Sequence, residues 1–372
     1  MERWKSSLEN MVTTKRQIET DDISYIHKKA NLELGLLANH DVLITGAGGF
    51  LGYYFIKTFH AWNIKNPEKK IGLTVLSTFR NGVPDWLQAL NKEKSLILLK
   101  ADISTFELSK KKHYDYIIHG ASIASPTFYR LYPVETINAN VQGLYKILDY
   151  VVAKRKSSPI IGLLYFSSSE IYGDPLKGNI PTPETYRGNV SCTGPRACYD
   201  ESKRFCETLC VNYSKVYDLP IKSARPFNNY GPGMKITDGR VIADFCRNIL
   251  KNEDIVMFSN GSPQRTFCYV TDAIVGYLKI LTKGKQAEAY NIGVATPEIT
   301  VANLAKKLIA IGRKEFDYKG KLIKIVSKDK AYLTDNPQRR CPDISKAKKQ
   351  LGYNPTVSLA NGLYKTIMWY KG

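Results

Sequence analysis

The sequence lacks any apolar run long enough to cross a membrane. A spanning helix needs about 18 to 20 consecutive apolar residues, and no segment of this chain approaches that length. The polar N-terminus also lacks the apolar core of a signal peptide. We therefore expect a cytoplasmic protein with no membrane partner.

Cysteine is scarce, and its spacing excludes the common cysteine-based sites. The 7 cysteines are an odd number, scattered along the chain. Cys206 and Cys210 lie one helical turn apart, but no histidine or further cysteine lies close in sequence to complete a ligand set. We expect reduced, buried thiols, without a disulfide framework and without a metal site.

Acidic residues are few relative to basic ones. There are 34 Asp and Glu against 54 Lys and Arg, which gives a formal net charge of +20. The lysines are spread along the chain, without the dense basic run interleaved with aromatics that is typical of a nucleic-acid surface. We expect no nucleic-acid partner, and we expect anionic substrates.

What the chain does contain is a long alternation of apolar runs and helical stretches. Its 372 residues, 43% of them apolar, are enough for about two domains with a sizeable core. Buried strands are predicted at 42–44, 73–76, 96–99, 116–119, 160–166 and 221–224. Such strands, separated by crossover helices, predict an α/β fold with a parallel sheet.

The chain divides into three segments of different composition. Residues 1–40 are polar, with a weak helical pattern through Ile23, Ile26, Leu32 and Leu36, and we interpret them as an N-terminal extension. Residues 41–225 hold the main strand and helix alternation. Proline and glycine punctuation predicts a smaller lobe over 226–372, with part of 262–290 returning to the first domain.

A glycine-rich turn follows the first predicted strand. The apolar residues 42–44 run directly into Gly46, Gly49 and Gly52, and an amphipathic helical pattern comes next. Such a turn lets backbone N–H groups approach a dinucleotide pyrophosphate where a Cβ would collide. The fold class is therefore predicted as a Rossmann-type doubly wound parallel sheet with a smaller C-terminal α/β substrate lobe.

Tyr199 and Lys203 form the most informative pair in the chain. Their i,i+4 spacing places both on one face of a helix. There an ammonium can lower the pKa of a phenol enough for the phenol to take a proton from a hydroxyl group. The pair is weak evidence alone, but together with the glycine turn it indicates dehydrogenase chemistry.

Polar motifs follow the predicted strands, where ligands collect in sheets of this kind. They lie at 46–52, Asp102, 119–122, 167–170 and 225–228. From about residue 41 onward the chain resembles the extended short-chain dehydrogenase/reductases that modify nucleotide-sugars, and among them the UDP-glucuronate decarboxylases, or UDP-xylose synthases. The most specific matches are 168–175, 188–190, 194–201, 238–241, 265–270 and 336–347.

The resemblance implies a lyase that converts UDP-glucuronate to UDP-xylose without net redox change. C4 is oxidised first, because a ketone next to C5 lets the electrons left by departing CO2 enter an enolate. Tyr199, assisted by Lys203, would take the 4-hydroxyl proton. Ser168 would orient that hydroxyl. Beside the C5 carboxylate the resemblance places Ser169, Glu170 and Arg265.

The resemblance also implies the binding residues. For the cofactor, NAD, they are Gly46, Gly49, Phe50, Leu51, Gly52, Arg80, Asp102, Ile103, Ala121, Tyr199 and Lys203. For the nucleotide-sugar, expected to be UDP-linked, they are Ser125, Asn228, Arg240, Phe258 and Arg265. Cations for the phosphates and an aromatic surface for the base are what such a ligand demands.

The second predicted strand ends without the expected acid. Enzymes of this fold that use NAD usually carry there an acid that binds the ribose 2′-hydroxyl, but this chain has Ser77, followed by Thr78, Phe79 and Arg80. A small polar residue with an arginine nearby suits a 2′-phosphate. NAD is the cofactor that the resemblance implies, and NADP stays open.

Two further departures concern the substrate. Gly233 stands where the decarboxylases commonly have an arginine, and the tract 174–187 is slightly longer than in the family. Both could reshape the pocket, so the reaction class is better specified than the sugar.

Related activities differ at positions 169 and 170. Nucleotide-hexose 4,6-dehydratases carry an Asp where this chain has Ser169, so a dehydratase would lack its acid. The 4-epimerases usually have a small or uncharged residue where Glu170 stands. A nucleotide-sugar 4-epimerase is the main alternative. A non-catalytic sensor is disfavoured because Ser168, Tyr199 and Lys203 are all present.

The resemblance further implies a homodimer. Its interface would be formed by the helix after Tyr199 and the helix around 140–150. Their apolar side chains, Phe205, Leu209, Leu144 and Leu148, permit such an interface, although they would also suit packing on the sheet.

Overall fold

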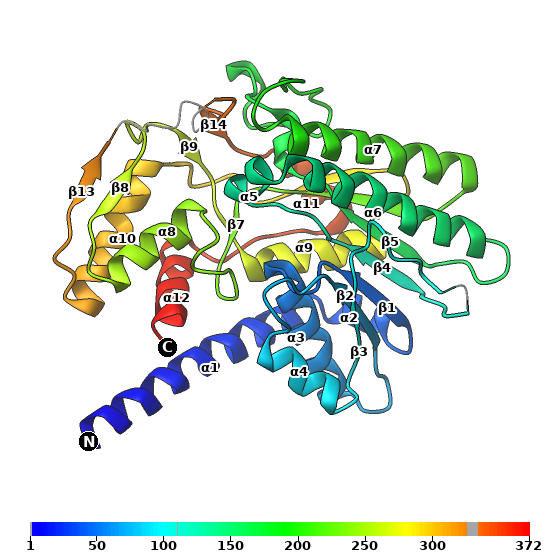
Figure 1. Cartoon of the computed structure of the whole chain (residues 1–372), viewed down its shortest axis with the longest axis horizontal. Helices are drawn as coiled ribbons and strands as arrows, with labels where there is room; N and C mark the ends of the chain where they lie inside the picture. The colour runs from blue at the N-terminus through cyan, green and yellow to red at the C-terminus, as the bar shows by residue number, and fades with distance from the viewer. Residues whose placement is uncertain (1, 110, 326–333) are drawn as a thin grey trace.

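A seven-stranded parallel sheet forms the centre of the molecule (Figure 1). The computed structural model describes residues 2–109, 111–325 and 334–372. The strands run in the spatial order β11-β6-β5-β4-β1-β2-β3, and each neighbouring pair is parallel. Their bounds are β1 (Asp41–Thr45), β2 (Gly72–Ser77), β3 (Ile97–Lys100), β4 (Tyr116–His119), β5 (Gly162–Phe166), β6 (Ile221–Pro226) and β11 (Ala289–Ile292). The predicted doubly wound parallel sheet is confirmed.

Helices cover both faces of this sheet. One core joins it to α3 (Phe50–Lys65) and α9 (Val270–Lys283), and a second core joins the other face to α6 (Pro133–Lys154) and α7 (Ala197–Tyr217). Strands β1, β4 and β5 are buried almost throughout, as parallel strands covered on both faces should be, whereas the edge strand β3 is partly exposed. Leu144 and Leu148 lie in the second core and are fully buried. They therefore pack on the sheet, not on an outer surface.

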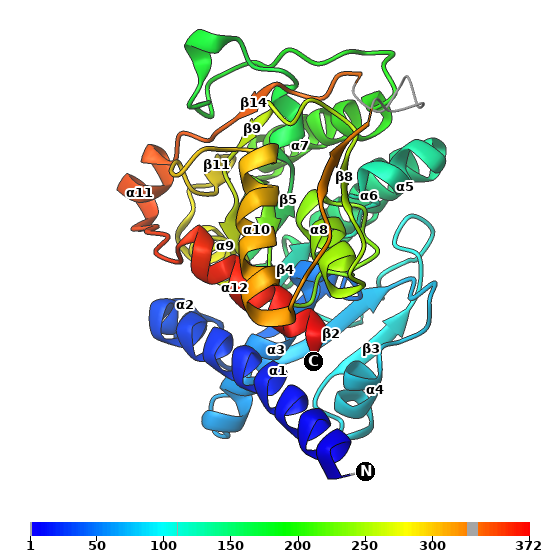
Figure 2. The ribbon, with the colours of Figure 1, turned by 90° about the vertical axis from the view of Figure 1, so that its left-hand side faces the viewer.

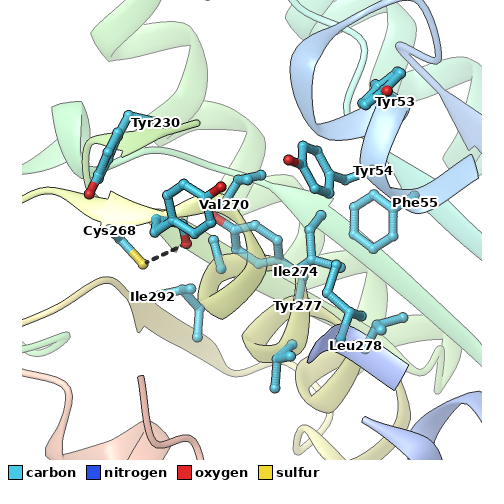
Figure 3. Close-up of a cluster of buried hydrophobic side chains, with 14 of the residues drawn as sticks. Tyr53, Tyr54, Phe55, Tyr230, Cys268, Val270, Ile274, Tyr277, Leu278 and Ile292 are labelled. Atoms are coloured by element: carbon cyan, nitrogen blue, oxygen red, sulfur yellow. Dashed lines mark hydrogen bonds between the residues drawn. The ribbon is translucent and has the colours of Figure 1, made fainter. Parts of the chain in front are cut away.

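The core under α3 and α9 is rich in aromatic residues (Figure 3). Tyr277 of α9 lies 4.7 Å from Phe166 and 6.4 Å from Phe55, measured between ring centroids. Ile274 and Leu278 complete the inward face of α9 and are fully buried. This packing fixes α3, the helix that follows the glycine turn, against the sheet.

Short strands and helices after β6 build a second group of elements, called the C-terminal lobe below. Its strands form three small sheets, β10-β7, β12-β9-β14 and β13-β8. The elements are β7 (Asn229–Tyr230), α8 (Val241–Leu250), β8 (Ile255–Met257), β9 (Gln264–Arg265), β10 (Cys268–Tyr269), β12 (Ile299–Thr300), α10 (Val301–Phe316), β13 (Leu322–Lys324), β14 (Arg339–Arg340), α11 (Ser345–Leu351) and α12 (Leu359–Lys371). Two further short helices, α4 (Asp85–Lys92) and α5 (Pro126–Leu131), belong to the crossovers of the central sheet.

The tract after β5 runs beside the segment that follows β14. It begins with the 3-10 helices η1 (Ser169–Tyr172) and η2 (Lys177–Asn179). The backbone of Thr182 donates to Cys341 O at 2.8 Å and accepts from Asp343 N at 2.9 Å. These bonds hold the two segments together (Figure 2).

The N-terminal extension is helical and part of it is docked on the rest of the chain. It consists of α1 (Glu2–Lys29) and α2 (Asn31–Leu37), and α1 projects outward toward its N-terminus (Figure 1). Asp22 is buried and accepts hydrogen bonds from Tyr54, Tyr269 and Lys365 at 2.7 to 2.8 Å. The extension thus ties α3 to β10 and α12.

The face of the extension that packs inward is only partly marked by its weak helical pattern. Ile26 is buried, but Leu32 and Leu36 are exposed, while Leu34 and Leu37 are buried. None of the helices in the described part of the chain is long and apolar enough to cross a membrane.

Candidate active site

One cavity of about 1700 Å³ lies between the central sheet and the C-terminal lobe. A site for one small molecule typically occupies roughly 300–1,000 Å³, so this cavity has room for two ligands. Its lining includes every residue predicted for catalysis, cofactor or substrate: Gly46, Gly49, Phe50, Leu51, Gly52, Arg80, Asp102, Ile103, Ala121, Ser125, Ser168, Ser169, Glu170, Tyr199, Lys203, Asn228, Arg240, Phe258 and Arg265. The fold brings these positions together, while their individual roles stay predictions.

The glycine turn packs closely against neighbouring backbone at the start of α3. Gly46 has a φ of +76°, and a Cβ there would lie 2.6 Å from the backbone of Gly120. A Cβ on Gly52 would lie 2.7 Å from Ala47 O. Gly49 is the N-cap residue of α3 and has no side chain that could accept a hydrogen bond from the helix. The first backbone N–H groups of α3 can therefore bind a ligand. These features fit the pyrophosphate of a dinucleotide.

Tyr199 and Lys203 are buried in the first two turns of α7. Lys203 Nζ donates to Phe166 O at 2.8 Å and lies 5.8 Å from the centroid of the Tyr199 ring. Burial lowers the pKa of Lys203 to about 8, so its ammonium form predominates at pH 7. The helix therefore places a positive charge near the phenol, as the i,i+4 spacing predicted.

The pKa of the Tyr199 phenol, in contrast, lies above its ordinary value. Burial raises this pKa to about 12, against the lowering effects of a hydrogen bond with Ser168 and of the Arg240 charge. The expectation of a lowered pKa is therefore wrong for the polypeptide by itself, because desolvation outweighs the nearby cations. Proton uptake by Tyr199 needs further positive charge in the cavity.

Ser168 directly precedes η1 and lies between the phenol of Tyr199 and the carboxylate of Glu170. Its Oγ accepts the backbone N–H of Glu170 at 3.2 Å, as an N-cap does. Ser168 forms a hydrogen bond with Tyr199, while Glu170, two residues later, contacts Arg340 of the C-terminal lobe. One short turn thus supplies both a hydroxyl beside the phenol and a carboxylate beyond it.

Glu170 is held by two arginines. Arg340 binds it bidentately, with Nη1 and Nη2 at 2.5 and 2.6 Å from the two carboxylate oxygens, and Arg196 Nη2 contacts Oε2 as well. Burial alone would raise the pKa of Glu170, but the charges of Arg196, Arg340 and Arg265 lower it to about 2. The carboxylate is therefore ionised at neutral pH.

Arg265 adds a third guanidinium to this cluster. Its Nη1 donates to Gln264 O at 2.8 Å, and its Nη2 donates to Pro337 O at 2.5 Å and Asn336 Oδ1 at 3.2 Å. Burial and the neighbouring charge of Arg340 lower the pKa of Arg265 to about 9. A cation whose pKa is lowered by like charges is stabilised by an arriving anion.

Asp200 lies next to Arg196 and contributes a titrating carboxylate to the net charge of this cluster. Its Oδ2 is 3.5 Å from Arg196 Nε, and its Oδ1 has no hydrogen-bond partner among the described residues. Burial raises the pKa of Asp200 to about 7, and the charge of Glu170 adds to this effect. Three guanidinium groups thus face one permanent and one titrating carboxylate, which leaves the cluster positive.

Tyr129 forms a second aromatic wall next to the phenol. Its ring stacks on that of Tyr199, with centroids 5.0 Å apart and planes inclined by 13°. The Tyr129 hydroxyl is buried without a hydrogen-bond partner in the part of the chain that is described. An unpaired polar group that lines a cavity is available to a ligand.

The predicted substrate-binding residues line the part of the cavity next to the C-terminal lobe. Ser125 Oγ donates to Asp238 O at 2.7 Å, and Asp238 in turn binds Arg240 Nε at 2.8 Å. Asn228 adopts a left-handed φ of 43° and donates to Thr266 O. Phe258 is 44% exposed, so its ring is a surface of the cavity and not part of the core.

The local structure explains why position 233 is a glycine. Its φ is +84°, and a Cβ would lie 2.8 Å from the ring of Tyr53 on α3. An arginine there would be strained and would collide, so the cation common in the decarboxylases cannot simply be restored.

Arg196, Arg340, Asp200 and Tyr129 were not predicted as site residues. Arg196 and Arg340 lie inside the matched segments 194–201 and 336–347, which was a signal for their involvement. Their contact with Glu170 spans 26 and 170 residues of sequence, and no local pattern reveals such a pairing. Tyr129 lies in α5, outside every matched segment.

The fold and the site together define a class of protein. A Rossmann-type sheet, a glycine turn and a Tyr/Lys pair in one cavity are the features of an extended short-chain dehydrogenase/reductase. Residues 42–293 match the model of the NAD dependent epimerase/dehydratase family. The chain belongs to this family.

Curated relatives and solved structures agree with this assignment. UDP-glucuronic acid decarboxylase 6 of Arabidopsis thaliana is 36% identical over 326 residues, which cover 88% of this chain and 87% of the relative. UDP-glucuronic acid decarboxylase 1 of Xenopus tropicalis is 34% identical over 338 residues, which cover 89% and 72%. UDP-glucose 4-epimerase of Thermotoga maritima, solved with UDP-glucose, superposes with a TM-score of 0.74 at 24% identity, covering 89% of this chain and 98% of that one. The dTDP-glucose 4,6-dehydratase DesIV of Streptomyces venezuelae, solved with NAD, has a TM-score of 0.74 at 23% identity, covering 89% and 96%.

Proposed function

We propose that this protein decarboxylates UDP-glucuronate to UDP-xylose through transient oxidation at C4. The observation that carries the proposal is the positive cluster of Arg196, Arg265 and Arg340 in the same cavity as Tyr199 and Lys203. A sugar that offers a hydroxyl to the phenol can place a neighbouring carboxylate among the guanidinium groups. The names of the curated relatives support the choice of UDP-glucuronate.

Tyr199 takes the proton of the 4-hydroxyl in the first step. Ser168 orients this hydroxyl through its own Oγ, which is next to the phenol. The ammonium of Lys203, whose pKa of about 8 keeps it protonated at pH 7, stabilises the phenolate charge together with the positive charge that an oxidised nicotinamide would add in the cavity. When bound, the dinucleotide accepts the electron pair of the C4–H bond and returns it at the end of the cycle.

Loss of CO2 follows because the C4 ketone makes the sugar a β-keto acid. The bond between C5 and the carboxylate carbon breaks, and its electron pair enters the C4 carbonyl as an enolate. The arginines bind the carboxylate during this step and balance the charge that moves from it to the C4 oxygen. The enolate then takes one proton at C5, and Tyr199 returns the proton that it borrowed.

Glu170 acts as an anion in this scheme and not as the acid that protonates C5. Its pKa of about 2 leaves it without a proton at neutral pH. Its bidentate bond with Arg340 and its contact with Arg196 hold these guanidinium groups in place. We infer that Glu170 orients the arginines. We also infer that it positions the solvent molecule from which a proton reaches C5.

Product analysis tests this proposal. Purified protein is given UDP-glucuronate without added reductant, and CO2 and the nucleotide-sugars are measured. We expect CO2 and UDP-xylose in equal amounts. A UDP-hexuronate formed without CO2 would reject the decarboxylase and identify a 4-epimerase, the alternative that shares the Tyr199 chemistry.

We also propose that two chains associate through α5, α6 and α7. The exposed apolar side chains on these helices include Leu131, Val134, Ile137, Phe205 and Val216. The buried Leu144 and Leu148 take no part. Light scattering at micromolar concentration should give about twice the 42.0 kDa of one chain, and the monomer mass would exclude this assembly.

A further inference from the structure

The end of β2 carries a hydroxyl where an NAD enzyme of this fold usually carries a carboxylate. Ser77 is the last residue of β2 and lines the cavity. A Cβ built on Gly48 would lie 3.2 Å from Ser77 Oγ, so this hydroxyl lies directly against the glycine turn. A carboxylate at this point accepts the 2′-hydroxyl of the adenosine ribose. Ser77 offers no negative charge to repel a phosphate group there.

The loop after Ser77 directs an arginine along the same wall. Phe79 has a left-handed φ of 45° and is buried, and its ring lies 3.2 Å from the position of a Gly48 Cβ. Gly82 N donates to Phe79 O at 2.9 Å and closes a tight turn. Because Phe79 turns inward, Arg80 and Asn81 lie on the outer side of this turn, and both line the cavity.

Arg80 is weakly engaged by protein groups. Its side chain is 57% exposed, and its nearest acid is Asp102, with the two charged groups 4.0 Å apart. Asp102 already accepts the backbone N–H and the hydroxyl of Ser104 with its other oxygen. Lys100, which pairs with Ser77 in the register of β2 and β3, is exposed and does not line the cavity.

We propose that this pocket accepts a 2′-phosphate, bound by Arg80 and the hydroxyl of Ser77, and that the protein binds NADP at least as tightly as NAD. A guanidinium and a phosphate form charge-assisted hydrogen bonds, which are stronger than neutral ones. The inference concerns the dinucleotide alone. It stands whether the sugar is decarboxylated or epimerised.

Asp85 provides the competing interpretation. It begins α4 and also lines this part of the cavity, so it could accept a ribose 2′-hydroxyl in place of the missing acid. The pocket would then select NAD, and Arg80 would only contact solvent and Asp102. If Arg80 binds a 2′-phosphate, replacing Arg80 should weaken NADPH binding. If Asp85 binds the ribose 2′-hydroxyl, replacing Asp85 should weaken NADH binding.

The test compares the cofactors that the protein holds and binds. Mass spectrometry of the denatured, purified protein identifies the dinucleotide that co-purifies, and titration with NADPH and NADH, followed by nicotinamide fluorescence, gives both affinities after the bound cofactor is removed. The variants are Arg80→Ala, Ser77→Asp and Asp85→Asn. Arg313→Ala on α10, an exposed arginine outside the cavity lining, is the matched control.

We expect Arg80→Ala to weaken NADPH binding by about 10- to 100-fold, the range for a charged hydrogen bond, and to leave NADH binding within about twofold. Ser77→Asp should reverse the preference toward NADH, and Asp85→Asn and Arg313→Ala should change neither affinity. An NADH affinity of the unmodified protein higher than its NADPH affinity would overturn the proposal. So would an NADH affinity that depends on Asp85. Neither result would bear on CO2 release, which is measured separately.

Discussion

Replacing Arg340 by leucine removes the bidentate partner of a buried carboxylate. The two guanidinium nitrogens of Arg340 lie 2.5 and 2.6 Å from the oxygens of Glu170, and the arginine side chain is only 7% exposed. After the substitution Glu170 stays charged and keeps its contact with Arg196. The protein must then hold a carboxylate that is only partly compensated.

Two routes give a similar size for this effect. Removing one partner of a buried ion pair costs roughly 3–5 kcal/mol, and the remaining Arg196 brings the cost to the lower end. The pKa of Glu170, about 2 in place of 4.5, corresponds to about 3 kcal/mol of stability at neutral pH, shared among its arginines. We expect the free energy of unfolding to fall by about 2–3 kcal/mol. With an unfolding entropy of about 0.8 kcal/mol/K for a chain of this length, the midpoint should fall by about 3–4 °C.

Thermal and urea unfolding measure this change, with Arg339→Leu as the matched control. Arg339 is the neighbouring residue and binds Glu298 at 2.7 and 2.9 Å, but its side chain is 37% exposed. Its loss should cost below about 1 kcal/mol. The double variant Arg340→Leu, Glu170→Leu should recover part of the stability that Arg340→Leu loses, because the buried carboxylate that lacked its bidentate partner is gone, while Arg196 keeps its contact with Asp200. If Arg340→Leu is no less stable than Arg339→Leu, the ion pair does not stabilise the fold as reasoned here.

Three further changes test other parts of the account. The pKa of Asp200 is raised to about 7 from 3.8, so the folded protein holds a proton that the unfolded chain releases, and the free energy of unfolding falls as the pH rises from about 4 to about 7. Asp200→Asn should reduce this pH dependence in urea unfolding, and an unchanged pH dependence would show that Asp200 does not hold the proton. Tyr199→Phe should lower CO2 release by about 10² to 10⁴-fold while dinucleotide binding is retained, whereas turnover at the original rate would show that another group takes the proton. Asp22→Ala should cost about 3 kcal/mol in thermal unfolding, because two buried phenols and the partly buried ammonium of Lys365 lose their acceptor. A change below about 0.5 kcal/mol would mean that this residue does not hold the extension in place.

Much of the central fold could be predicted from local sequence patterns. The run at 116–119 coincides with β4, and the other five predicted strands overlap β1, β2, β3, β5 and β6. Each is a short apolar run between turn-forming segments, and in the inner strands burial on both faces gives a continuous apolar run in place of an alternating pattern. Because ligands collect at the carboxyl ends of parallel strands, the motifs after these runs could also be assigned to one site.

Long-range contacts and burial could not be predicted in this way. The arginines around Glu170 come from α7 and β14, and only the folded chain shows that they meet. The phenol of Tyr199 was expected to be acidified by Lys203, but sequence does not reveal how far desolvation opposes that effect. The inward face of the N-terminal extension could not be read from its weak helical pattern, since Leu34 and Leu37 are buried while Leu32 and Leu36 are exposed.

The most direct test of the central claim follows the hydrogen at C4. UDP-glucuronate labelled with deuterium at C4 is incubated with the purified protein in ordinary water, and the released nucleotide-sugar is analysed by mass spectrometry and NMR. If C4 is oxidised and reduced again within one cycle, UDP-xylose should form with its deuterium still at C4 and an unlabelled hydrogen at C5. Release of CO2 with loss of the C4 label, or a labelled UDP-hexuronate without CO2, would contradict the redox-neutral decarboxylation proposed for this cavity.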